Sequence, residues 1–181
     1  MNQSKISVRY AKAVFMLAKE KNVLNRIYND FKLIRETISE ASEFDLVISS
    51  PTVSPADKLN IFTKVYQNSV HEITMRFLGL LVDKNREIYL VDIARYFETL
   101  YRKANNIKQV VVTTTHPISE EIAKNISNLV ATGFESTVEI KNTIKDDMIG
   151  GIILRIDNQQ LDLSVKTQLH DIKKKLKSKS Y

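Results

Sequence analysis

The sequence changes character at Asn105-Asn106, and this change limits the chain to a fold with two different parts. Before this point, apolar side chains recur at helical spacing throughout. Directly after it, Ile107 to Thr115 forms a run rich in Val and Thr that is typical of a β-strand. We therefore predict an α+β protein overall. Residues 1–105 would form an N-terminal all-α six-helix bundle, and residues 106–181 a small C-terminal α+β domain.

The first predicted helix, which continues to about Asn22, is apolar on two sides. Its first apolar stripe comprises Ile6, Tyr10, Ala13, Val14 and Leu17. A second stripe, made of Ala11, Phe15 and Ala18, is rotated from the first. A helix that is apolar on two sides must bury both of them. It is either a central helix of the bundle, or a helix that packs one side on the bundle and the other against a helix of a partner.

A later helix, predicted to start at Ser69, also carries one strongly apolar face. Gly79 lies inside this helix, where it costs about 1 kcal/mol relative to Ala and permits close approach of another helix. The residues predicted on this face are Ile73, Phe77, Leu80 and Leu81.

The segment from Met148 to Leu176 holds two of the four glycines in the chain. Gly150-Gly151 opens an apolar strand that ends at Ile156, and a polar turn over residues 157–160 follows. Residues 161–164 then lead into a final amphipathic helix, with Ser164 as its candidate N-cap. With Ile107–Thr115 and Phe134–Ile140, this segment predicts three strands in the second domain.

The sequence contains few candidates for catalytic, metal-binding or cofactor-binding residues. The chain has no cysteine, which excludes disulfides and thiolate chemistry, and its three histidines are widely spaced. No glycine-rich phosphate loop is present. Asp162, Ser164 and His170 could form a hydrolytic triad, but no nucleophile-elbow glycines flank the serine. We expect no catalytic residue, no metal and no cofactor, and a protein that works through its surfaces.

The net charge of +6 is concentrated at the end of the chain, where residues 172–181 hold five lysines and no acid. Such a tail is more often a solvated helix end than a nucleic-acid site, although a small basic nucleic-acid-associated helical bundle stays an alternative. No apolar run approaches the ~20 residues that span a bilayer, and the N-terminus lacks the apolar core of a signal peptide. Any membrane association would go through a partner or the surface.

Three motifs of the sequence resemble signatures of one family, the delta subunit of the bacterial F-type ATP synthase, which includes the mitochondrial oligomycin sensitivity-conferring protein. Residues 10–18, YAKAVFMLA, resemble its first helix, and residues 81–86, LVDKNR, its mid-chain motif. The C-terminal signature is similar to residues 148–152 and 161–169. The family usually has Gly-Asp where this chain has Asp157-Asn158, and often has Gly at the positions of Leu163 and Thr167.

The resemblance implies a non-catalytic stator subunit at the periphery of the cell inner membrane, on its cytoplasmic side, in a hetero-oligomeric complex. The helical domain would bind the N-terminal helix of an alpha subunit between its first and fifth helices, and the C-terminal domain would meet the b subunits. Nucleic acid would not be a partner. The groove candidates are Tyr10, Ala13, Val14, Leu17, Phe77, Leu80 and Leu81, and the structural signature residues are Arg86, Gly150, Gly151, Asp162 and Ser164.

Overall fold

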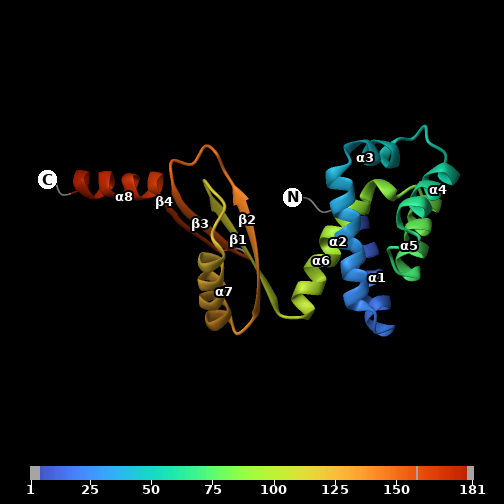
Figure 1. Cartoon of the computed structure of the whole chain (residues 1–181), viewed down its shortest axis with the longest axis horizontal. Coiled ribbons are helices and arrows are strands. Elements are labelled where there is room, and N and C mark those ends of the chain that lie inside the picture. The colour runs from blue at the N-terminus through green and yellow to red at the C-terminus, as the bar shows by residue number, and fades with distance from the viewer. Residues whose placement is uncertain (1–4, 158, 179–181) are drawn as a thin grey trace. The chain divides into compact units, whose positions relative to one another are not determined.

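The computed structural model describes residues 5–157 and 159–178, and it divides the chain into two compact units, Met1–Tyr101 and Arg102–Tyr181. The first unit is helical, and the second holds a sheet with helices (Figure 1). The expected α+β class is confirmed.

The helical unit is built from amphipathic helices around one apolar core. The core joins every helix of the unit and contains the large fully buried side chains of Phe31, Phe62, Tyr66 and Phe97. The helices are α1 (Lys5–Glu20), α2 (Leu24–Glu40), α3 (Ser42–Ser49), α4 (Pro55–Tyr66), α5 (Glu72–Asp83) and α6 (Leu90–Ala104), with the 3-10 turn η1 (Glu87–Tyr89) before α6.

Local capping determines where two of these helices begin. The Ser54 hydroxyl accepts a hydrogen bond from the Asp57 N–H, and Pro55 takes the first helical position of α4, as the sequence predicts. The predicted start of α5 at Ser69 is wrong by three residues. His71 caps this helix instead, because its Nδ1 accepts from the Ile73 N–H and so satisfies a free donor of the first turn.

The second unit contains a four-stranded sheet in the order β2-β1-β3-β4. The strand β1 pairs in parallel with β2 and antiparallel with β3, and β3 pairs antiparallel with β4. The helix α7 connects β1 to β2 and lies against the sheet (Figure 1). Its Ile126 and Val130 share a core with Val110 and Val112 of β1. The elements are β1 (Ile107–Thr114), α7 (Glu120–Phe134), β2 (Thr137–Ile144), β3 (Gly151–Ile156), β4 (Gln159–Ser164) and α8 (Val165–Ser178).

The prediction of three strands is wrong, because the residues expected to lead into the last helix form β4. Their side chains alternate between apolar Leu161 and Leu163 and polar Asp162 and Ser164, which is the two-residue period of a strand. The hairpin to β3 turns at Asp157, whose φ of 50° lies in the left-handed region. The rest of the predicted turn includes Asn158, which lies outside the described residues.

The second strand lies three to four residues later than expected. The sequence predicts it over Phe134–Ile140, but α7 continues through Phe134 and ends at Glu135, which adopts a left-handed φ of 47°. The Asn106 side chain donates to the Glu135 carbonyl at 2.9 Å and holds this turn in place. The strand therefore starts at Thr137 and continues past Ile140 to Ile144.

Candidate functional site

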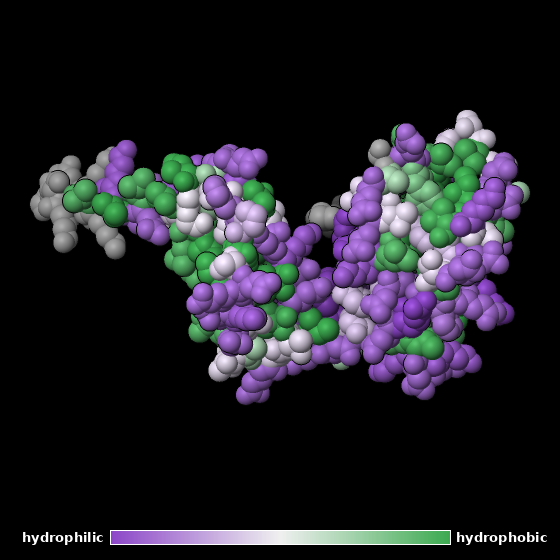
Figure 2. All heavy atoms as spheres, in the orientation of Figure 1, coloured by the Kyte–Doolittle hydropathy of each residue, from purple (hydrophilic) through white to green (hydrophobic). Residues whose placement is uncertain are grey.

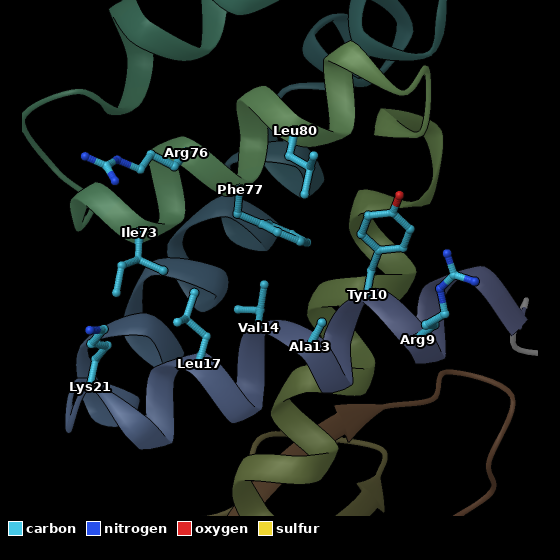
Figure 3. Close-up of a pocket in the computed structure, with 10 residues that line it drawn as sticks. All are labelled: Arg9, Tyr10, Ala13, Val14, Leu17, Lys21, Ile73, Arg76, Phe77 and Leu80. Atoms are coloured by element: carbon cyan, nitrogen blue, oxygen red, sulfur yellow. The ribbon is translucent and has the colours of Figure 1, made fainter.

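The helical unit has an open groove between α1 and α5, with a volume of about 550 Å3. Figure 3 shows the α1 side chains Tyr10, Val14 and Leu17 directed toward α5, which directs Phe77 and Leu80 back toward α1. The lining is mostly apolar. Its ten residues are Arg9, Tyr10, Ala13, Val14, Leu17, Lys21, Ile73, Arg76, Phe77 and Leu80.

The groove explains why α1 is apolar on two sides. Ala11 and Ala18 of the second stripe are fully buried, and Phe15 packs against the same core. The first stripe, apart from Ile6, lines the groove instead, and its Leu17 remains 40% exposed. One side of α1 thus builds the bundle, and the described residues leave the other side partly open.

The floor of the groove is continuous with the aromatic core. Val14 and Phe77 are buried at its base, and the Phe77 ring lies 6.2 Å from the Tyr10 ring and 5.8 Å from the Phe31 ring. Phe31 in turn packs on Phe97 of α6, with ring centroids 4.7 Å apart. Such ring contacts fix the floor, because any shift of Phe77 would disturb the packing of the bundle centre.

The α5 wall is held at its start by a buried carboxylate of α2. Asp30 Oδ2 accepts hydrogen bonds from the His71 N–H at 2.8 Å and from the Thr74 hydroxyl at 2.6 Å. Arg26 Nε lies 3.4 Å from the other oxygen of Asp30. These bonds satisfy a charge that is only 2% exposed and anchor the first turn of α5 to the core.

Arg86 holds both walls of the groove at the other end. Its backbone N–H donates to the Leu81 carbonyl at 2.8 Å and closes the C-terminal turn of α5. Its Nη1 donates to the Tyr10 hydroxyl at 2.8 Å, and its guanidinium carbon lies 5.4 Å from the centre of the Tyr10 ring. The residue therefore connects the end of α5 to the rim of α1.

The structure brings six of the seven groove candidates together around this groove. Leu81 is the exception: it is fully buried in the bundle core, whereas its neighbour Leu80 is 44% exposed. Sequence reasoning did not assign four lining residues to the groove: Arg9, Lys21, Ile73 and Arg76. Ile73 could have been found, because it lies one helical turn before Phe77 on the predicted apolar face.

The C-terminal signature residues shape the junction between β4 and α8. The Ser164 N–H donates to Asp162 Oδ1 at 2.9 Å, and Ser164 Oγ accepts from the Thr167 N–H at 3.3 Å, which makes it the N-cap of α8. The Val165 N–H donates to the Gly150 carbonyl at 3.0 Å. Hydrogen bonds from the side chain and then the backbone of Ser164 lower the pKa of Asp162.

Gly151 stands where no side chain fits. Its φ is +87°, and an added Cβ would lie 2.5 Å from the Leu163 carbonyl oxygen and 2.8 Å from the Ser164 Cα. Both atoms belong to backbone, so they cannot rotate away as a side chain would. The glycine is therefore required by the close crossing of β3 and the end of β4.

The arrangement around Ser164 does not form a nucleophile and base pair. Asp162, Ser164 and His170 line one shallow hollow, together with Thr167. However, the Ser164 hydroxyl lies 3.1 Å from the Thr167 hydroxyl, and Asp162 bonds to the backbone of Ser164. These bonds cap a helix, whereas a triad requires the base to bond the serine and the acid to bond the base.

The sheet unit exposes a second apolar surface, on α8. Figure 2 shows hydrophobic side chains along α8, which extends past the edge of the sheet in Figure 1. On α8 they recur at the spacing of one helix face. We call this set the α8 surface: Leu169, Ile172 and Leu176, all more than 50% exposed.

Residues 5–157 and 159–178 contain neither a candidate metal site nor a candidate membrane span. No group of three or more His, Cys, Asp or Glu side chains could hold a metal ion there. None of the described helices has the length and apolarity needed to cross a membrane.

Comparisons with known proteins give a consistent result over nearly the whole chain. The family described as "ATP synthase delta (OSCP) subunit" matches residues 6–176. The "ATP synthase subunit delta" of Clostridioides difficile (strain 630) is 33% identical over 172 residues, which cover 94% of this chain and 95% of the relative. That of Desulforamulus reducens is 33% identical and covers 99% of both chains.

A solved structure shows the same arrangement of elements. A chain in the Toxoplasma gondii mitochondrial ATP synthase hexamer is 25% identical and superimposes with a TM-score of 0.79, over 96% of this chain and 98% of that one.

Proposed function

Because the chain belongs to the ATP synthase delta (OSCP) subunit family, whose members are non-catalytic stator subunits of the F-type ATP synthase, we propose that its α1–α5 groove binds the N-terminal helix of the alpha subunit. The observation that carries this proposal is the uncovered apolar side of α1. A stripe of Tyr10, Ala13, Val14 and Leu17 faces α5 across a groove of about 550 Å3, on a helix whose other side is buried.

The groove suits an amphipathic helix better than a small molecule. Its apolar residues on α1 recur at intervals of three and four, which is the pattern that receives the apolar stripe of another helix. Both walls are already fixed by Asp30 and Arg86, so binding would order the incoming helix without reorganising the bundle. Because the groove is preformed, little of the binding free energy is lost to ordering the bundle.

We further propose that the sheet unit binds the b subunits of the peripheral stalk. The α8 surface supports this, because its apolar side chains are exposed beside Lys166, Lys173 and Lys174. The partner would be a helix with an apolar stripe and acidic neighbours. One subunit that binds two partners through separate units gains effective affinity by linkage.

The function is mechanical. The chain is a peripheral component of a membrane-bound complex, and in our proposal it lies on the cytoplasmic side of the inner membrane, as a six-helix domain followed by a stalk-binding domain. It would hold the catalytic head against the torque of the rotor, so that proton flow is coupled to ATP synthesis.

The test is calorimetry of the full chain with a synthetic peptide of the N-terminal segment of the alpha subunit from the same organism. We expect micromolar or tighter binding with a negative heat-capacity change, because apolar surface is buried. Ala13→Asp should abolish it, since a carboxylate would then have to be buried in the groove. Ala56→Asp, on an exposed position of α4, is the matched control and should bind as the wild type does.

Two results would count against the proposal. The first is no heat of binding at micromolar concentrations of the wild-type chain. The second is binding to RNA or DNA that persists at physiological ionic strength, which would favour the nucleic-acid alternative.

A further inference from the structure

The two ends of the α1–α5 groove carry positive charge. Arg9 lies at one end of the groove on α1, and Lys21 lies at the other end, with Arg76 of α5 on the same side as Lys21 (Figure 3). No acidic residue lines the groove among the residues that the structure describes. Arg76 is already paired with Glu72 on its own helix. For Arg9 and Lys21, the described residues provide no carboxylate within ion-pair distance.

The two cations, Arg9 on α1 and Lys21 directly after its last residue, belong to one row that continues the α1 surface. Arg9, Ala13, Leu17 and Lys21 follow one another at intervals of four residues, and all four line the groove. This row is a ridge of the kind that packs into a facing helix. Its centre is apolar and both its ends are cationic. Other lysines of α1, Lys12 and Lys19, are exposed but do not line the groove.

We propose that Arg9 and Lys21 select a partner helix whose apolar stripe is bracketed by carboxylates at both ends. This inference rests on the proposed function of the groove and specifies the chemistry of its occupant. Twelve residues separate the two cations, which corresponds to about 18 Å along α1 at 1.5 Å per residue. A helix lying along this groove would therefore present its carboxylates about three turns apart, with apolar residues between them.

The cations lie at the rim, so they act mainly on partner choice and on the rate of encounter. Complementary rim charges accelerate association and reject a helix with basic ends, while the apolar centre supplies most of the affinity. A helix with the same apolar stripe but amide ends would bind less tightly, and one with lysine ends would be repelled. The effect should weaken with salt, because both cations are exposed to solvent.

The experiment compares two double variants of the full chain with the same loss of charge on the same helix. Arg9→Gln with Lys21→Gln removes the groove cations, and Lys12→Gln with Lys19→Gln is the matched control. The probe is the synthetic N-terminal peptide of the alpha subunit, titrated at about 50 and 300 mM salt, with melting curves to confirm that both variants fold.

We expect each groove cation to contribute about threefold in Kd, the value of an exposed charge pair, and the groove double variant to bind about tenfold more weakly at low salt. Most of its dependence on salt should be lost, while the control should keep the wild-type Kd within about twofold. Replacing the acidic residues of the peptide by their amides should weaken binding to the wild type but not weaken binding to the groove variant further.

The proposal is overturned if the two double variants bind alike, or if the affinity of the wild type does not change with salt. Either result would leave the groove as a binding site that does not recognise charge. Failure of the wild type to bind the peptide at all is a different outcome, and it would contradict the proposed function itself.

Discussion

The groove of the helical unit and the α8 surface of the sheet unit differ in what lies beneath them. Among the residues that the structure describes, the core under the groove contains nineteen buried apolar residues, and the groove walls are fixed by Asp30 and Arg86. The core beside the α8 surface contains four buried apolar residues in the same described ranges, and α8 extends past the sheet (Figure 1). One chain thus carries a recessed, preformed groove and a raised helix that rests on a small core.

In our proposal, this difference lets one small subunit bind its two partners in different ways. A fixed groove favours one helix of matching shape, since it loses little conformational entropy on binding. A raised amphipathic helix with few neighbours adapts to the surface it meets, and part of its binding free energy goes into its own ordering. We expect the helical unit to keep its conformation when its partner binds, and the free energy of unfolding of the sheet unit to rise when its partner binds.

The largest effect should come from truncating the core under the groove. Phe31 is fully buried and contacts Phe77 at the groove floor as well as Phe97. Phe31→Ala should lower the free energy of unfolding of the helical unit by about 3–5 kcal/mol, because it leaves a cavity. Urea unfolding of the full chain measures this. Leu129→Ala, at an exposed position of α7, should change stability by less than about 0.5 kcal/mol.

Gly151 tests the sheet unit in the same way. Gly151→Ala would force a Cβ against the backbone of Leu163 and Ser164, so the sheet unit should lose about 2–4 kcal/mol or fail to fold. The matched control is Gly133→Ala in α7, where an added Cβ meets nothing within 4 Å. This control should stabilise the unit by up to about 1 kcal/mol, because Ala favours the helix. Similar losses for both variants, measured by thermal unfolding, would contradict the account.

Arg86 tests whether the groove is preformed. Arg86→Gln removes the guanidinium from Tyr10 but keeps the backbone bond to Leu81, and it should cost about 1–2 kcal/mol of stability. It should also weaken binding of the alpha peptide several-fold, because Tyr10 is no longer held at the rim. Tyr10→Phe keeps the ring and loses only the hydroxyl, so its effect should be smaller. An Arg86→Gln variant that binds with unchanged Kd would show that the rim does not depend on this contact.

The smallest effect concerns the pKa of Asp162, which hydrogen bonds from Ser164 hold below the ordinary value of 3.8. Since the folded pKa is lowered, the charged form favours folding above pH 3.8, and that contribution is lost as the pH falls through the folded pKa. Ser164→Ala should move the pKa of Asp162 back toward 3.8, as measured by a carboxyl NMR titration. Thr132→Ala, on α7, should leave it unchanged. An unshifted Asp162 in the wild type would contradict the described junction.

The sequence predicted the groove better than it predicted the sheet, for physical reasons. The apolar period of a helix identifies the side chains on one face, which is why Tyr10, Val14 and Phe77 were found. It does not separate neighbours such as Leu80 and Leu81, because both lie near the face and only packing decides which one enters the core.

The strand β4 was missed although its alternating side chains were visible. Four residues with a two-residue period, placed directly before a strong helix pattern, are too few to outweigh the capping signal of Ser164. That signal was correct, since Ser164 ends the strand and caps the helix at once. The cations at the groove ends were missed for another reason: a charge at the edge of an apolar stripe resembles any solvated helix position until the opposite wall is known.

Cysteine cross-linking in the assembled ATP synthase tests the central claim most directly, that the uncovered side of α1 is covered by the alpha subunit. The chain has no cysteine of its own, so a single introduced one is its only thiol. Ala13→Cys lines the groove, and Lys12→Cys lies next to it on α1 but does not. We predict a disulfide between Cys at position 13 and a cysteine placed in the N-terminal helix of the alpha subunit, with little from position 12. Equal cross-linking from both positions, or none from position 13, would contradict the account.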